Sequence, residues 1–579
     1  MQWDKDDCAD MGIVKVDLLG LGMMAVLQDS LKLVPNLDLA HLPPDDPAVY
    51  RMLQEADTIG VFQVESRAQM ATLPRLKPTH FYDLVVEVAL IRPGPIVGQM
   101  VHPYLDRRAG RAPVEYAHPS LEPILKRTLG VPLFQEQLLR IAMVAAGFTG
   151  GQAEDLRRAM GFKRSEKRMK TIELQLRDGM AAKGITGAAA EQIITSIASF
   201  ALYGFPESHA ASFALLAYAS AYLKAHYPAA FYCALLNNQP MGFYHPASLV
   251  KDAQRRGVRF HPIDVQVSDW DCCVETDGGI RLGLRYVSGL RREAGIAIAA
   301  VSPLPGAQRS APLICPKCRC DDASMIERGD DGRFFCNTCS YDWPASPKRE
   351  QRDGGPIQPG RFKSIDDLVA RAGLRRPELV TLADIGALNA FGYDRRSALW
   401  QAERAVRPAG ELFSNSECGI ENSEFLIPNS EFHDDACPLQ PMTEGERLVA
   451  DYAGMGLTVG RHPMALRREE LAMRGILRAS DLRSARQGRR VRVAGMVITR
   501  QRPGTAKGFV FLTLEDETGI ANIIVRPDLF ARDRLVIVEE PFLIVDGILQ
   551  SQDGVTSIRA EQVQGMRGVD VDFDAHDFY

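Results

Sequence analysis

Two basic segments in the first half of the chain carry the residue types that bind phosphate groups. They span residues 155–164 and 203–211, and each contains a glycine. Arginine side chains present paired N–H groups that match phosphate oxygens, and fixed cations offset the charge that builds up on a leaving pyrophosphate. The segments therefore predict a site for a nucleoside triphosphate, with the candidate residues Arg157, Arg158, Lys163, Tyr203, Ser208 and His209.

A single candidate carboxylate for a catalytic metal lies near the start of the chain. Residues 12–18 predict a strand that holds Lys15 and Asp17, followed by a glycine-rich turn and a helix over residues 23–34. Nucleotidyl transfer by two metal ions needs more than one carboxylate to hold the ions. We therefore expect Asp17 to bind Mg²⁺, and we expect this polypeptide alone to be inactive in nucleotidyl transfer.

Four cysteines form two pairs with the spacing of a zinc ribbon. Two residues separate Cys315 from Cys318, and after seventeen more residues Cys336 and Cys339 repeat that spacing. Four thiolates bind Zn²⁺ tetrahedrally and leave no open position for catalysis. We expect a structural or DNA-contacting zinc ribbon, inserted at about residues 302–360. The alternative is four unrelated thiols in a loop.

Hydrophobic periodicity divides the rest of the chain into helical and strand-rich parts. From residue 48 to about residue 227, apolar residues recur every three or four positions, which predicts helices. Short alternating runs at residues 258–287 and 489–564 predict strands. The five runs in the second region predict an OB-type barrel, a fold whose groove often binds single strands. Phe509 and Phe511 share a face there, either as a base-stacking platform or as core.

The overall composition is that of a soluble protein with several domains. Apolar residues make up 46% of the 579 residues, charged residues make up 24%, and the net charge is −5. Because no apolar run of about eighteen residues occurs and the acidic start is not a signal peptide, we expect a cytoplasmic protein without a membrane span. A threefold repeat of period seven, starting at Asn415, Asn422 and Asn429, is expected to be a disordered linker.

Six motifs occur in a fixed order along the helical part. They are Gly60–Arg67, Ala89–Pro95, Leu133–Gln137, Leu156–Gly161, Tyr203–Phe205 with Ser208–Ala210, and Leu223–Pro228. Together they resemble the fingers region of the bacterial C-family replicases, the alpha subunits of DNA polymerase III. The segments Gly456–Met464 and His576–Tyr579 resemble the error-prone branch of that family, which acts in damage tolerance.

The resemblance implies a DNA-directed DNA polymerase that adds dNTPs to a primer–template. It places Lys15 and Asp17 in the palm, and it assigns His209 to the triphosphate, although the histidine taken alone is better explained as a helix cap. Residues 283–290 and 382–392 resemble helix-hairpin-helix elements that offer backbone N–H groups to DNA phosphates. In the first of them Ser288 departs from the expected glycine, which puts its DNA contact in doubt. Two further palm aspartates of the family have no counterpart, so we expect the C-terminal half of such an enzyme.

The expected architecture is multidomain α+β, with mostly helical fingers, a helix-hairpin-helix region that carries an inserted zinc ribbon, and a C-terminal OB-type β-barrel. Its expected parts are a palm remnant (1–30), fingers (31–278), the helix-hairpin-helix region (279–410), a repeat linker (411–440), a helical connector (441–488), the OB-fold (489–566) and a tail (567–579).

The expected cofactors are Mg²⁺ in the complete enzyme and structural Zn²⁺. The expected partners are primer–template DNA, dNTP, a separately encoded N-terminal polymerase half, a sliding clamp and other mutagenesis proteins. The alternatives to a polymerase half are a non-catalytic remnant that binds DNA and nucleotides, and an unselected fragment without activity.

Overall fold

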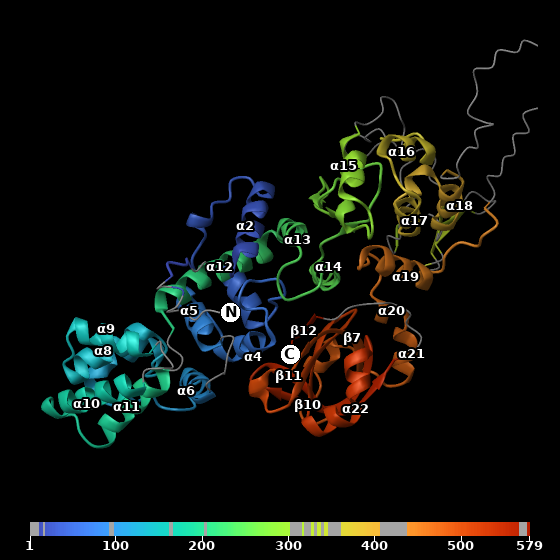
Figure 1. Cartoon of the computed structure of the whole chain (residues 1–579). Coiled ribbons are helices and arrows are strands. Elements are labelled where there is room, and N and C mark those ends of the chain that lie inside the picture. The colour runs from blue at the N-terminus through green and yellow to red at the C-terminus, as the bar shows by residue number, and fades with distance from the viewer. Residues whose placement is uncertain are drawn as a thin grey trace, which may run out of the picture.

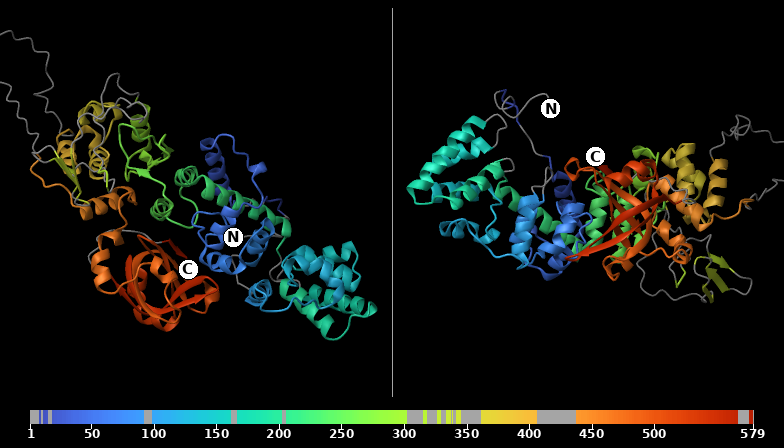
Figure 2. Two further views of the ribbon diagram at one scale, coloured as in Figure 1. Left: turned by 180° about the vertical axis from the view of Figure 1, so that it is seen from behind. Right: turned by 90° about the horizontal axis from the view of Figure 1, so that it is seen from below.

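The structure of the chain is a computed structural model, mostly helical, with a β-barrel in its C-terminal part (Figure 1). A helical lobe of residues 122–201 and the helices of residues 365–405 lie at opposite ends of the molecule, as two further views show (Figure 2). The structure describes residues 8, 11–14, 18–91, 98–160, 166–201, 205–301, 315–317, 326–328, 333–336, 338, 341–344, 361–405, 437–566 and 576–578.

The centre of the molecule is built around the long helix α12 (Glu207–His226). Alanines spaced three or four residues apart are at most 1% exposed, and their small side chains let neighbouring helices approach closely; they are Ala210, Ala214, Ala217 and Ala221. The helices that pack on α12 are α2 (Leu21–Leu33), α3 (Pro47–Gln54), α5 (Phe81–Leu90) and α13 (Pro228–Asn237). Outside them, α4 (Arg67–Leu76) packs on α3 and α5, and α14 (Pro246–Arg255) packs on α13.

A separate lobe at one end of the molecule has its own apolar core. Its helices are α7 (Glu122–Leu125), α8 (Gln135–Ala146), α9 (Gly150–Met160), α10 (Glu166–Ala182) and α11 (Ala188–Ala201), and α6 (Gly98–Arg108) precedes it. Gly179 lets α10 cross the end of α8, because a Cβ at this position would collide with the carbonyl oxygen of Ala146. The predicted helical periodicity of this region is confirmed.

The helix-hairpin-helix region follows the fingers. A small sheet of β1 (Phe260–His261), β2 (Cys273–Val274) and β3 (Ile280–Arg281) leads to α15 (Arg292–Ala300). After residues 302–360 come α16 (Ile365–Ala372), α17 (Arg376–Asp384) and α18 (Arg395–Ala405), and α15 packs directly on α16. Within residues 302–360, an antiparallel sheet is formed by β4 (Ile326–Arg328), β5 (Arg333–Cys336) and β6 (Tyr341–Pro344).

The C-terminal part is the predicted barrel. Helices α19 (Glu444–Met455), α20 (Pro463–Leu466) and α21 (Arg468–Met473) lead to β7 (Arg490–Gln501), β8 (Val510–Asp516), β9 (Gly519–Val525), β10 (Phe542–Gln552) and β11 (Val555–Gly565). The strand order β10-β11-β9-β8-β7 closes through a β10–β7 pairing, which is an OB-type connectivity. Helix α22 (Pro527–Glu539) lies between β9 and β10, and β12 (His576–Phe578) pairs with β7.

The predicted strand at residues 12–18 is wrong for the part that the structure describes. Residues 11–14 and 18 are not in a strand, and residues 15–17 lie outside the described ranges. A strand needs a paired neighbour to satisfy its backbone groups, and no described segment pairs with these residues. The helix that follows is α2, which begins at Leu21 rather than at Met23. The period-seven repeat lies outside the described residues.

Candidate nucleotide and DNA-binding sites

The arginines of the first basic segment lie on the exposed end of α9. Leu156 anchors this helix in the lobe core, while the side chains of Arg157 and Arg158 are 46% and 62% exposed. Both pair with Glu154: Arg157 Nη2 lies 2.7 Å from Glu154 Oε1, and Arg158 Nε lies 3.3 Å from the same oxygen. Their hydrogen bonds and charges lower the pKa of Glu154 to about 2. A phosphate that binds these arginines therefore has to replace a carboxylate of the same helix.

Sequence reasoning missed Glu154, although its spacing from the arginines was a usable signal. Residues three and four positions apart share one face of a helix, so Glu154 reaches both Arg157 and Arg158. Lys163, the third predicted cation, lies outside the described residues.

The second basic segment places its histidine in an aromatic cluster. The His209 ring lies 5.1 Å from the Phe205 ring and 4.2 Å from the Phe213 ring, measured between centroids. Ser208 is exposed, and its carbonyl oxygen accepts a hydrogen bond from Ser212 Oγ at 3.0 Å. The N-cap residue of helix α12 is Pro206, and the first N–H of the helix, that of Glu207, is capped by Glu136 of α8, so His209 does not act as the cap that the residue taken alone suggested.

Helix α8 connects the two segments. The N–H of Gln135 donates to the carbonyl oxygen of Phe205 (3.0 Å), and the N–H of Glu207 donates to Glu136 Oε2 (2.9 Å). Helix α9 packs on the same helix. No described contact joins Arg157 or Arg158 directly to the start of α12, so α8 positions both segments without bringing their side chains together. Tyr203 lies outside the described residues.

The structure describes only some of the metal ligands that the sequence predicts. Lys15, Asp17, Cys318 and Cys339 lie outside the described residues. Cys315 and Cys336 are fully buried, together with Ile326 and against partly buried aromatic rings. Two buried thiols, one in a small antiparallel sheet and one packed beside it, are donors that suit structural Zn²⁺.

One other group among the described residues has a metal-ligand arrangement, namely His261, Glu275 and Asp277. Arg281 pairs with Glu275, and Arg259 Nη2 lies 3.1 Å from Asp277 Oδ2. Because arginines already neutralise both carboxylates, this group is an ion-pair cluster rather than a metal site.

The first hairpin of the helix-hairpin-helix region uses its backbone internally. The N–H of Ser288 donates to the carbonyl oxygen of Gly454, at the end of α19, over 2.8 Å. This N–H is therefore not available to a DNA phosphate. In the second hairpin Gly386 and Gly392 adopt positive φ angles of 81° and 89°, which glycine takes readily, between α17 and α18.

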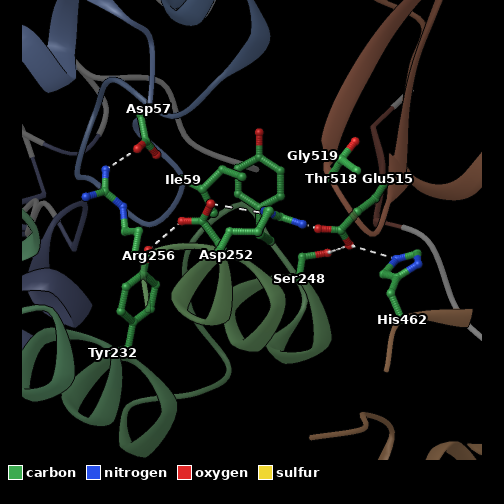
Figure 3. Close-up of polar contacts among 12 residues, drawn as sticks. Asp57, Ile59, Tyr232, Ser248, Asp252, Arg256, His462, Glu515, Thr518 and Gly519 are labelled. Atoms are coloured by element: carbon green, nitrogen blue, oxygen red, sulfur yellow. Dashed lines mark hydrogen bonds and ion pairs between the residues drawn. The ribbon is translucent and has the colours of Figure 1, made fainter. Parts of the chain in front are cut away.

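A buried polar network ties α12 to α14 and to the loop that follows α3 (Figure 3). Lys224 is fully buried on α12, and its Nζ donates to Ile59 O (2.8 Å), Asp252 Oδ2 (2.9 Å) and Asp57 Oδ1 (3.2 Å). Burial on its own raises the pKa of Asp252. The positive charges of Lys224 and Arg255, together with hydrogen bonds, outweigh the burial and hold the pKa below its ordinary value.

The same network continues into the barrel through Glu515 of β8, which is fully buried. Arg255 Nη2 donates to Glu515 Oε1 (2.8 Å), Ser248 Oγ donates to Oε2 (3.4 Å), and His462 Nε2 lies 3.9 Å from Oε2. Burial raises the pKa of Glu515, and Arg255 partly offsets that rise. Burial lowers the pKa of His462 well below its ordinary value, and Lys251 and other nearby cations act in the same direction, so the imidazole is neutral.

Arg67 makes a second contact between the fingers and the barrel. Its Nη1 donates to the carbonyl oxygens of Leu512 (3.1 Å) on β8 and Ile523 (2.9 Å) on β9. Its guanidinium carbon lies 4.9 Å from the centre of the Phe511 ring. Phe511 was one of the two predicted base-stacking residues, and in this structure an arginine of the chain itself stacks on it.

Comparison with known families assigns a class to three parts of the chain. Residues 21–184 match the family model described as the bacterial DNA polymerase III alpha subunit finger domain. Residues 257–303 match a helix-hairpin-helix motif, and residues 491–564 match an OB-fold nucleic acid binding domain. The chain therefore combines helical fingers, a helix-hairpin-helix motif and an OB-fold, as predicted.

The chain is also similar over nearly its whole length to proteins named error-prone DNA polymerase. It is 44% identical over 568 residues to that of Dechloromonas aromatica, which covers 97% of this chain and 49% of the relative. The protein of Pseudomonas aeruginosa is 42% identical over 576 residues, covering 98% of this chain and 49% of the relative. The chain spans about half the length of the curated relatives it matches.

Among solved structures, an asparaginyl-tRNA synthetase of Pyrococcus horikoshii is 24% identical, with a TM-score of 0.14, over 16% of this chain and 23% of that chain. At this TM-score the likeness supports no inference about fold or function. In the part of the chain that the structure describes, no helix is long and apolar enough to cross a membrane.

Proposed function

We propose that the chain provides the nucleotide-binding and DNA-binding part of an error-prone DNA-directed DNA polymerase that acts in damage tolerance. The observation that carries the proposal is the 44% identity, over 97% of this chain, to a protein named error-prone DNA polymerase. The exposed arginines at the end of α9, held by one carboxylate, support it further, because an incoming triphosphate can take the place of Glu154.

In this proposal each predicted site residue has a role. The phosphates would be contacted by Arg157, Arg158, Lys163, Ser208 and His209, and Tyr203 would pack against the base or sugar. Lys15 and Asp17 would belong to the palm. Asp17 would hold Mg²⁺ in a complete enzyme, and that ion would stabilise the charge on the transferred phosphate. Zn²⁺ would be held by Cys315, Cys318, Cys336 and Cys339, where it stabilises the inserted sheet.

The nucleotide site is tested by measuring the affinity of the purified full-length chain for a fluorescent dNTP in the presence of primer–template DNA. Arg158→Ala is expected to weaken dNTP binding about tenfold to a hundredfold, since hydrogen bonds to charged groups contribute about 1.5–3 kcal/mol. Arg177→Ala is the matched control, because Arg177 also pairs with a glutamate four residues before it and is 39% exposed. Equal affinities of the two variants would contradict the assignment.

Primer extension separates the polymerase from the non-catalytic alternative. We expect the chain alone to bind primer–template DNA without extending it, and we expect extension when a polypeptide with the missing palm aspartates is added. Binding without extension in both conditions would favour the non-catalytic binding remnant. Primer extension by the chain alone, and no extension by an Asp17→Asn variant prepared in the same way, would refute the expectation that the chain alone is inactive.

A further inference from the structure

The conventional ligand face of the barrel is partly covered by the fingers. OB-folds bind oligonucleotides on their second and third strands and on the loops between strands one and two and between strands four and five. In this barrel those strands are β8 and β9, and Arg67 bonds to both of them and covers the Phe511 ring. The Arg67 side chain thus lies on the Phe511 ring, where a base would stack in the conventional binding mode.

The loop between β10 and β11 is held by the fingers as well. Arg111, which follows α6, lies 3.4 Å from Asp553 in this loop. The backbone of Gly554 approaches Pro74 of α4 closely enough that a Cβ there would lie 3.3 Å from the proline ring. A single strand that binds in the conventional way would have to displace these contacts.

Exposed arginines elsewhere on the barrel carry a positive charge, and we call this set the arginine surface. Six exposed arginines form it, on β7, on β11 and in the segment that leads into β7; they are Arg483, Arg486, Arg489, Arg490, Arg492 and Arg559. The strand register sets Arg490 and Arg559 on either side of Ile548, so all three share one outward face. The turn before β7 is fixed to β10, where the N–H of Leu549 donates to the carbonyl oxygen of Arg489 over 2.9 Å.

Most of this charge is not neutralised within the protein. Arg490 pairs with Glu561 (3.0 Å), and Arg492 pairs with Asp546 (2.7 Å). The other four arginines of the arginine surface form no ion pair with any residue in the described ranges. Exposed guanidinium groups without an ion-pair partner are suited to phosphates spaced along a nucleic-acid backbone.

We propose that the barrel contacts the phosphate backbone of DNA through the arginine surface, while its conventional face stays docked on the fingers. This inference rests on the proposed DNA-binding function and adds which side of the barrel performs it. The single-stranded template and the primer–template duplex both present this backbone, so the experiment has an arm for each.

The test measures the affinity of the full-length chain for fluorescent DNA at several KCl concentrations, with a template overhang in one arm and a blunt duplex in the other. Arg486→Gln/Arg489→Gln is expected to weaken binding about tenfold and to lower the salt slope by about 1.4–1.8, from 0.7–0.9 per phosphate contact. Arg532→Gln/Arg534→Gln removes two exposed charges from α22 and is expected to leave both quantities unchanged.

Phe511→Ala reports on the conventional face and is also expected to leave DNA affinity unchanged. A loss with Phe511→Ala, together with an unchanged salt slope in Arg486→Gln/Arg489→Gln, would overturn the inference and leave the proposed function standing. A wild-type chain that binds neither DNA at low salt would instead overturn the proposed function, and the inference with it. An effect confined to the overhang identifies the template strand as the ligand, and an equal effect in both arms identifies the duplex.

Discussion

Replacing Lys224 by methionine is expected to destabilise the fingers strongly. The ammonium group is fully buried, and it lies 2.9 Å from Asp252, a carboxylate that is itself 6% exposed. Methionine has a similar volume but leaves this carboxylate with one less cation and leaves the carbonyl oxygen of Ile59 without its Lys224 donor. Removing one partner of a buried ion pair costs about 3–5 kcal/mol, because the remaining charge stays buried.

Hydrogen exchange of α12 and α14 in the native protein measures this loss as a local opening free energy. A cost of 3–5 kcal/mol corresponds to exchange that is faster by about a hundredfold to several thousandfold. Lys32→Met is the matched control, because Lys32 lies 2.7 Å from Asp29 but its side chain is 67% exposed. Exposed pairs of this kind contribute about 1 kcal/mol or less.

A second substitution tests whether the buried charge is the cause. Lys224→Met/Asp252→Asn removes both charges, so we expect it to cost less than the sum of the two single substitutions. A Lys224→Met protein that exchanges no faster than Lys32→Met would refute the reasoning. So would a double variant whose cost equals the sum.

Three further perturbations have expected outcomes. Burial lowers the pKa of Lys251 to about 7. Between pH 7 and 10 this lysine is therefore protonated in the unfolded chain but not in the folded protein, so it makes the free energy of unfolding rise by about 1.4 kcal/mol per pH unit. Urea midpoints across this range should show the rise in the wild type and not in Lys251→Met, and equal slopes in the two proteins would contradict the assignment. Arg67→Ala should speed hydrogen exchange in β8 and β9, because at least about 2 kcal/mol of charge-assisted hydrogen bonding is lost. Exchange in α8–α11 should stay the same, and unchanged exchange in the barrel would argue against the contact. Metal analysis should find about one Zn²⁺ per chain, and the zinc should be lost in Cys336→Ser and retained in Cys437→Ser. A wild-type chain without zinc would contradict the prediction of a zinc ribbon.

The fold was predictable where a local pattern carries it. Apolar spacing of three and four predicted residues 135–146 as helical, which are the bounds of α8, and alternating residues predicted all five barrel strands. Helix α22 was not predicted, because residues 527–539 have no clear apolar face. The strand at residues 12–18 was predicted from composition, but a strand also depends on a partner that local pattern does not identify.

The polar contacts that position the sites were much less predictable. Glu154 was available from helical spacing, because it and its arginines lie within four residues. Lys224, Asp252 and Glu515 come from segments far apart in the sequence, and a charged residue in an amphipathic pattern is ordinarily expected on the surface. Their burial follows from tertiary packing, so the sequence contains no local signal for it.

The packing of α15 on α16 has a practical consequence for engineering. The two helices flank residues 302–360, and Arg361 is fixed beside the small β1–β3 sheet by hydrogen bonds to the carbonyl oxygens of Ser268 (2.6 Å) and Val267 (3.3 Å). The chain thus leaves and re-enters this region between two elements that already touch. Since the entropy of closing a loop grows only slowly with its length, the position is suited to accept a grafted reporter domain without disturbing the helices on either side.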